Sequence, residues 1–329
     1  KLDKQLHGKT IIGGSHATLL PDDCLGHFDW IVRGEGEGVL LEILAGEIPQ
    51  GIVSVPRIAN LDSLPLPAWQ LTEHPFSETL FLGERYGKSE WAMTIIGSRG
   101  CPFACSFCGN SLRTPVVYRS IDSILAEVEA LKTLGVKQFR FEDDNITLHP
   151  QFESLCIKMR RMGVRWKAHT RADLLQKNNA ELLKFGGCEE CGIGVESADD
   201  VVLELNNKKE TVADHIRAVK ILKDAGLRVK TYFITGLPGE TEATLIKNMH
   251  FIAAVQPDKW TVSTFIPYPG CDIYRNPDKY NIRIIDKDFS NWWNFAPHFV
   301  HENNGQTRAQ MWKRYIYFYE WLKSDVWRH

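Results

Sequence analysis

Three cysteines within eight residues are the part of the sequence best suited to metal chemistry. Cys101, Cys105 and Cys108 stand in the segment CPFACSFC, directly after a Gly-Ser-Arg-Gly turn at residues 97–100. A loop of this length can wrap three thiolates around one iron–sulfur cluster, and three cysteines leave one iron of a [4Fe–4S] cluster without a protein ligand. Zinc is the alternative, but a structural zinc site needs four ligands, and the nearest downstream histidine is His149.

The elements that must position this loop are alternating strands and helices, from about residue 91 onward. We predict strands at residues 92–97, 137–142, 164–169, 191–196, 228–235 and 260–266. Helices are predicted between them, with Ser120 and Thr211 as N-caps and with Gly135 and Gly226 at helix ends. Six alternating units indicate parallel strands, in a partial barrel or an open wound sheet. In both architectures the chemistry belongs at the carboxyl ends of the strands.

Polar or small residues follow several of these strands, and each has a structural as well as a functional interpretation. Asp143 and Asp144 follow the second strand, where they can bind an ammonium group or simply form a turn. Arg171 follows the third strand and suits either a ligand carboxylate or a structural ion pair. The segment GLPGET at residues 236–241 follows the fifth strand, and its small residues let the backbone approach a flat ligand.

The cysteine spacing, Phe107 before the last cysteine and the position after the first strand resemble the radical S-adenosylmethionine (radical SAM) superfamily. The resemblance covers residues 91–274, because later strand ends also match the family's order. It implies that the three cysteines hold a [4Fe–4S] cluster whose open iron chelates SAM, and that an electron from the reduced cluster cleaves SAM to methionine and a 5′-deoxyadenosyl radical. It also implies a set of residues around SAM: Phe107, Asp143, Asp144, Arg171, Glu196, Ser197, Gly236 and Pro238.

The N-terminal stretch carries glycine motifs of another kind. Residues 11–18 (IIGGSHAT) and 33–37 (RGEGE) follow two short predicted strands and resemble the second half of a cobalamin-binding domain, which precedes the barrel in one large radical SAM subfamily. The resemblance assigns cobalamin contacts to Gly13, Gly14, Ser15, His16, Gly34 and Glu35. The D-x-H-x-x-G loop expected upstream is absent. Three explanations stay open: a truncated gene or protein, a fragment of a longer chain, or a lineage that lost cobalamin.

The expected fold class is α/β, in four parts. A partial cobalamin-binding-like segment (1–55) has too little surface to be stable alone. A linker (56–90) with Pro65, Pro67 and Pro75 leads to a partial (βα)6 radical SAM barrel (91–285). The aromatic-rich tail (286–329) is predicted to contain a helix that Thr307 caps. This helix is expected to close the open side of the barrel, to form a lid or wall of a substrate pocket, or both.

The remaining cysteines have a simpler interpretation. Cys188 and Cys191 form a second CxxC, which can be a second cluster, a redox pair or small residues packed where a helix enters a strand. Auxiliary clusters of the superfamily use further cysteines in a C-terminal extension, and none follows Cys271. The packing interpretation is therefore favoured, as it is for Cys24 and Cys156.

Composition excludes several classes of protein. Lys+Arg total 39 and Asp+Glu 41, so the formal charge of −2 argues against wholesale binding to nucleic acid or acidic membranes. No apolar run approaches the roughly 20 residues of a membrane span. The start lacks the apolar core of a secretion signal, and eight cysteines are too few for a disulfide scaffold. A cytoplasmic location is expected.

The sequence therefore predicts a radical SAM enzyme that abstracts hydrogen from a small-molecule substrate. The expected outcome is cobalamin-dependent methyl transfer to carbon or phosphorus. The alternatives are cobalamin-independent oxidation, cyclisation or rearrangement and, more remotely, a non-catalytic metal-binding module. An external electron donor such as flavodoxin or ferredoxin is expected as a partner. The substrate and the residues that act on it are not identified by any motif.

Overall fold

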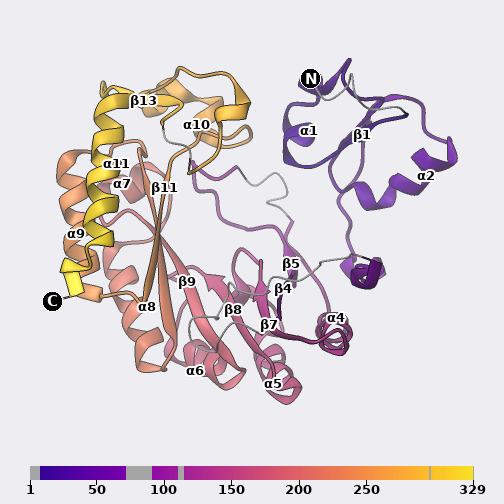
Figure 1. Cartoon of the computed structure of the whole chain (residues 1–329), viewed down its shortest axis with the longest axis horizontal. Coiled ribbons are helices and arrows are strands. Elements are labelled where there is room, and N and C mark those ends of the chain that lie inside the picture. The colour runs from indigo at the N-terminus through magenta and orange to yellow at the C-terminus, as the bar shows by residue number, and fades with distance from the viewer. Residues whose placement is uncertain (1–7, 72–90, 110–114, 296–297, 329) are drawn as a thin grey trace.

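The computed structural model describes residues 8–71, 91–109, 115–295 and 298–328, and in these ranges it confirms the predicted α/β fold class. A curled parallel sheet with helices along one face forms a half-barrel (Figure 1). A smaller N-terminal sheet lies beside the end of the half-barrel that carries the cysteine loop (Figure 1).

The half-barrel sheet contains the six predicted strands, with ends shifted by no more than three residues. These are β4 (Trp91–Ile95), β7 (Val136–Phe141), β8 (Arg165–Thr170), β9 (Cys188–Glu196), β10 (Arg228–Thr235) and β11 (Lys259–Thr264). They pair in parallel in the order β11-β10-β9-β8-β7-β4, so spatial order follows chain order. All six carboxyl ends therefore meet at one edge, as the predicted site requires.

Helices on one face of the sheet enclose the main core. They are α4 (Ile121–Thr133), α5 (Phe152–Met162), α6 (Lys177–Phe185), α8 (Val212–Asp224) and α9 (Glu242–Val255). The short helix α7 (Asp200–Leu205) contributes Val202 to a separate buried cluster. The predicted N-caps are confirmed: Ser120 accepts from Ser123 N, and Thr211 forms a capping box with Asp214. Every second residue of the strands, for example Phe141 and Trp166, points into this core. This explains why the strands are rich in β-branched and aromatic residues.

The opposite face of the sheet is polar because the other alternate residues point to it. His169 of β8 and Tyr232 of β10 share a hydrogen bond of 2.8 Å across the strand between them. Gly192 of β9 stands at this crossing, where an added Cβ would lie 2.5 Å from the His169 ring and 2.8 Å from the Tyr232 ring. The glycine therefore lets two rings meet over a strand.

The N-terminal unit (residues 8–55) is a three-stranded parallel sheet. Its elements are β1 (Ile11–Ile12), α1 (Ser15–Leu19), β2 (Trp30–Arg33), α2 (Leu40–Ala45) and β3 (Gly51–Ser54). The sequence analysis missed β3, because four residues between a glycine-containing turn and a proline carry little strand signal. Gly34 has φ +101°, and a Cβ there would lie 2.8 Å from Val55 O, so the turn after β2 requires glycine.

The described half of the predicted linker packs on the half-barrel. It forms short 3-10 turns at Leu61–Ser63 and Trp69–Leu71. Asp62 accepts from Ser120 N at the start of α4 (2.9 Å), and Trp69 donates to Glu127 (3.2 Å). Residues 61–71 therefore pack against α4 and do not form a free linker. Residues 72–90, including Pro75, lie outside the described residues.

The C-terminal part adds α10 (Asp272–Arg275), an antiparallel pair of β12 (Ile282–Ile284) and β13 (His301–Asn303), and α11 (Arg308–Lys323). Thr307 caps α11 as predicted. Phe318 of α11 packs on Phe233 of β10, with ring centroids 5.8 Å apart. The helix therefore lies beside α9 on the outer, helix-covered face (Figure 1). It does not act as a lid, because its buried side points away from the polar face of the sheet. None of the helices in the described ranges is long and apolar enough to span a membrane.

Candidate active site

The three cysteines lie on a loop that follows β5 (Ser98–Arg99) at the carboxyl edge of the sheet. Cys105 is buried, whereas Cys101 and Cys108 are partly exposed, and within the described ranges none of the three forms a disulfide bond. Cys108 N donates to Cys105 O (3.1 Å), and Asn145 Nδ2 lies 3.5 Å from Cys101 Sγ. Within the described ranges, no three His, Cys, Asp or Glu side chains converge on a position for a single metal ion.

The cysteine loop is held by the connection between α7 and α8. Ser106 N donates to Asn206 O (3.0 Å), and Asn207 Nδ2 donates to Ala104 O (2.6 Å). On the other side, Ile273 N of α10 donates to Ser106 O (3.2 Å). These bonds satisfy backbone groups of a loop that has no regular structure of its own, and so fix its position relative to β9 and β10.

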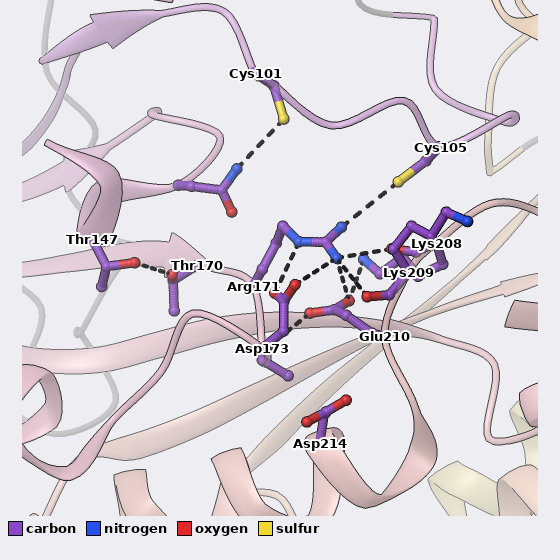
Figure 2. A network of polar contacts seen from close by, with 12 residues as sticks. Cys101, Cys105, Thr147, Thr170, Arg171, Asp173, Lys208, Lys209, Glu210 and Asp214 are labelled. Atoms are coloured by element: carbon purple, nitrogen blue, oxygen red, sulfur yellow. Dashed lines mark hydrogen bonds and ion pairs between the residues drawn. The ribbon is translucent and has the colours of Figure 1, made fainter. Parts of the chain in front are cut away.

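Arg171 ties the cysteine loop to the end of β8 (Figure 2). Its guanidinium donates to both carboxylate oxygens of Asp173 (3.0 Å each) and to Lys208 O (2.8 Å). Nη1 lies 3.8 Å from Cys105 Sγ, and the guanidinium carbon lies 3.8 Å from the centre of the Phe103 ring. Arg171 thus forms the structural ion pair that the sequence analysis gave as one interpretation, and its role toward a ligand carboxylate stays a prediction.

Lys208 and Glu210 are functional candidates that the sequence analysis missed. Lys208 Nζ lies 3.1 Å from Glu210 Oε2 and 3.5 Å from Glu196 Oε1. Glu210 also accepts from Asp173 N (3.1 Å) and lies 3.5 Å from His215 Nε2. Burial opposes ionisation, but His215, Lys208 and Arg171 together hold the pKa of Glu210 well below its usual range. A buried network of charged side chains therefore supports the cysteine loop through Arg171.

Glu196 and Ser197 end β9 in an unusual conformation. Glu196 has φ +61°, which is rare for a residue with a side chain. Burial raises the pKa of Glu196, while Lys208 acts against that rise. Ser197 Oγ is buried and has no hydrogen-bond partner in the part of the chain that the structure describes. A buried hydroxyl of this kind suits a ligand that supplies the missing partner.

The predicted acidic pair divides into two environments. Asp143 is buried and accepts from Gly97 N (2.8 Å) and Ser98 Oγ (2.5 Å), so it supports the turn before the cysteine loop. Burial raises the pKa of Asp143, and these two donors oppose the rise. Asp144 is exposed beside Cys101, whose pKa it raises in addition to the effect of burial. The structure therefore leaves Asp144 as the carboxylate that a ligand can reach more easily.

The loop after β10 is tightly packed around Gly236 and Pro238. Gly236 O accepts from His301 Nε2 (3.0 Å) and Asn303 Nδ2 (3.2 Å). Its φ is +86°, and a Cβ there would lie 2.5 Å from the Phe299 ring, so only glycine fits. Pro238 O accepts from Asn206 Nδ2 (2.9 Å), which links this loop to the connection that holds the cysteines.

Phe107 and the second CxxC occupy apolar surroundings. Phe107 packs against a buried cluster that includes Leu237 and Phe265. Cys188 and Cys191 are fully buried in the main core, and Cys188 Sγ donates to Glu190 O (3.3 Å). The packing interpretation of this cysteine pair agrees with these surroundings.

The residues predicted to contact cobalamin lie in two separate places. Gly13 and Gly14 lead into α1, where Ser15 and His16 line a pocket of about 430 Å³ that faces the half-barrel. The other lining residues come from α1, the cysteine loop and the C-terminal part: Leu19, Gly109, Tyr268, Pro269, Phe289 and Trp292. Gly34 and Glu35 lie elsewhere, because buried Glu35 bonds to Arg99 Nη1 (2.8 Å) and Ile58 N (2.6 Å).

Comparison with known proteins gives consistent matches. Residues 95–252 match the Radical SAM superfamily. The chain is 29% identical, over 97% of its length, to an uncharacterized methyltransferase of Pyrococcus horikoshii. Over 84% of its length it is 31% identical to the bacteriochlorophyllide d C-12(1)-methyltransferase of Chlorobaculum tepidum and 29% identical to the anaerobic magnesium-protoporphyrin IX monomethyl ester cyclase of Rubrivivax gelatinosus. The chain spans 74%, 61% and 55% of these relatives' own lengths.

The fold extends the match to the N-terminal unit. The solved structure of the cobalamin-dependent S-adenosylmethionine radical enzyme OxsB, with aqua-cobalamin bound, shares the fold over 95% of this chain and 48% of its own, at a TM-score of 0.54 and 17% identity. The fold and the cysteine loop together define a half-barrel with a candidate metal site. Residues 95–252, which carry the cysteine loop and most of the half-barrel, belong to the radical SAM superfamily, whose cofactors are a [4Fe–4S] cluster and SAM.

Proposed function

We propose that this chain binds a [4Fe–4S] cluster through Cys101, Cys105 and Cys108 and uses it to cleave SAM reductively. The observation that carries the proposal is the placement of this loop at the edge where six parallel strands end. The bound cluster would supply the electron that splits SAM into methionine and a 5′-deoxyadenosyl radical. The radical would abstract hydrogen from a small-molecule substrate on the polar face of the half-barrel.

The chain's own residues would fix SAM above the strand ends. Asp144 is an exposed carboxylate that suits the ammonium group of SAM, and Ser197 Oγ is a buried hydroxyl in need of a partner. Glu196, which is paired with Lys208, would accept hydrogen bonds from the ribose hydroxyls. The packed loop at Gly236 and Pro238 offers backbone against which a flat base can lie. The proposed role of Arg171 toward SAM competes with its bonds to Asp173 and Lys208 O.

For the reaction outcome we propose methyl transfer that depends on cobalamin. Two of the relatives above are named methyltransferases, and Ser15 and His16 line the pocket between α1 and the half-barrel. Its volume of about 430 Å³ is enough for part of a large cofactor or for a small substrate. The cyclase among the relatives keeps cobalamin-independent radical chemistry as the second candidate. A one-electron donor such as flavodoxin or ferredoxin, and a cytoplasmic location, remain predictions.

The test is reductive SAM cleavage by the reconstituted protein. The chain would be loaded with iron and sulfide without oxygen, reduced, given SAM and assayed for 5′-deoxyadenosine. We expect product from the wild type and none from Cys105→Ala, which removes one cluster ligand and the cluster colour. Cys188→Ser is the matched control, because the buried hydroxyl keeps the bond to Glu190 O. Retained SAM cleavage by Cys105→Ala would overturn the proposal.

A titration with methylcobalamin separates the two outcomes of the reaction. If the methyl-transfer proposal holds, the absorption spectrum of cobalamin changes on binding and His16→Ala weakens that binding. Saturable SAM cleavage without any cobalamin affinity would instead support the cobalamin-independent alternative.

A further inference from the structure

Two buried cations, Arg171 and Lys208, belong to the charged network next to Cys105. The side chains of Lys208 and Arg171 are 7% and 6% exposed. The Arg171 guanidinium contacts Cys105, with Nη1 3.8 Å from Sγ, and Arg171 and Lys208 share the carboxylate of Glu210. Two buried positive charges are therefore fixed beside the cysteine loop.

Buried carboxylates hold the two cations in place. Glu210 Oε2 lies 3.1 Å from Lys208 Nζ and 3.8 Å from Arg171 Nη2, and the Glu210 side chain is fully buried. In Figure 2 the Arg171 guanidinium lies between Cys105 on one side and Asp173 and Glu210 on the other. The Arg171 guanidinium thus faces the sulfur, with the carboxylates of Asp173 and Glu210 behind it, so a positive charge of the network is directed toward the cysteine loop.

A positive charge near an iron–sulfur cluster stabilises its reduced form. Reduction of a [4Fe–4S] cluster from the 2+ to the 1+ state adds one electron and breaks no bond. The added negative charge interacts favourably with nearby cations, and this interaction is strong where water is excluded. Charges as deeply buried as Lys208 are weakly screened by salt.

We propose that Lys208 and Arg171, positioned by Glu210, raise the reduction potential of the cluster held at Cys101, Cys105 and Cys108. These are positioning residues, because they act on the cluster through the field at Cys105. The inference rests on the proposed function only in that the three cysteines must hold a cluster. The inference concerns the step in which the cluster accepts an electron from an external one-electron reductant. It does not depend on the identity of the substrate.

Two substitutions at the same ion pair should shift the potential in opposite directions. Lys208→Met removes the positive charge at similar length, so the reduced cluster loses stabilisation. Glu210→Gln removes negative charge behind the cations and should favour reduction. We expect each to change the ratio of oxidised to reduced cluster about tenfold at a fixed potential, which corresponds to 59 mV for one electron. The measurement is a redox titration of the reconstituted full chain without SAM, followed by electron paramagnetic resonance.

The controls separate electrostatics from structural damage. Lys208→Arg keeps the charge and should keep the wild-type potential. Lys247→Met removes an exposed lysine paired with Asp199, away from the cysteine loop, and should cause no shift. If Lys208→Met fails to take up iron, the direction of the Glu210→Gln shift decides. Shifts of both variants in the same direction, or no shift at normal iron content, would overturn the inference. Failure of the wild type to hold a cluster would overturn the proposed function instead.

Discussion

At the scale of single residues, Gly192 shows how one position shapes the polar face of the half-barrel. His169 and Tyr232 come from strands that are not neighbours, yet they share a hydrogen bond of 2.8 Å. Burial and the nearby Arg140 and Lys167 lower the pKa of His169 to about 4, so the imidazole is neutral at physiological pH. The pair is a rigid, uncharged element in the middle of the face on which a substrate would lie.

We expect Gly192→Ala to disrupt this pair and to destabilise the protein. The added methyl group would sit 2.5 Å and 2.8 Å from two aromatic rings, so at least one ring must move. Overpacking of this kind costs about 1–3 kcal/mol. Urea unfolding of the protein and of Gly38→Ala, where nothing lies within 4 Å of an added Cβ, would measure the difference. Equal stability of the two variants would contradict the expected clash.

The sequence alone predicted some residues of the candidate site and missed others. The cysteine loop could be predicted because its chemistry lies in short spacing along the chain. Lys208 and Glu210 could not, because a Lys-Lys-Glu run is typical of solvent-exposed loops and only the fold buries it. The sequence left Asp143 as either a ligand-binding carboxylate or a turn residue, and the structure shows that it accepts from Gly97 N and Ser98 Oγ. Whether a charged residue binds a ligand or supports the fold depends on which groups lie next to it in space, and the local sequence does not contain that information.

At the scale of elements, the loop between β10 and α9 joins three parts of the molecule through a buried carboxyl group. Glu240 Oε2 accepts from Gly236 N (3.0 Å), and Arg314 Nη2 of α11 lies 3.7 Å from Glu240 Oε1. Burial raises the pKa of Glu240 to about 7, and Arg314 and the Gly236 N–H group offset only part of this rise. The stability of this junction therefore depends on pH.

The sign of that dependence follows from the raised pKa. Below about pH 4.5 Glu240 is protonated in both states, and its favourable contribution to the free energy of unfolding is lost as the pH rises through about 7. The Glu240→Gln variant carries no ionisable group at this position. Its free energy of unfolding relative to that of the wild type should therefore increase by up to about 3 kcal/mol as the pH rises from roughly 4.5 to 8. Urea unfolding at both pH values is the measurement. Glu242→Gln, on the exposed first turn of α9, should show no such gain.

Elements with local signals were predicted well, and those defined by contacts were not. The strands of the half-barrel and the caps at Ser120, Thr211 and Thr307 follow from periodicity and capping chemistry. The position of α11 could not be read in this way. The helix and its cap were predicted, but the face of the sheet that the helix meets depends on the connection through β12 and β13.

At the scale of the whole molecule, one buried carboxylate joins the N-terminal unit to the cysteine loop. Glu35 Oε1 lies 2.8 Å from Arg99 Nη1 and 3.4 Å from Arg57 Nη1, and Arg57 Nη2 donates to Arg99 O (2.6 Å). Arg99 stands two residues before Cys101. The three-stranded unit is thus tied to the half-barrel by an ion pair whose carboxylate is buried.

We therefore expect Glu35→Gln to loosen the N-terminal unit while the half-barrel stays intact. The substitution keeps an acceptor for Ile58 N but removes the charge that Arg99 and Arg57 share. Amide hydrogens of β2 and β3 should exchange about tenfold faster, equivalent to roughly 1.4 kcal/mol, with β8 and β9 unchanged. Hydrogen exchange by mass spectrometry measures this, with Glu302→Gln at the exposed pair with Arg283 as the control. Unchanged exchange in β2 and β3 would mean that apolar contacts such as Leu19 against Gly270 hold the two parts together without the ion pair.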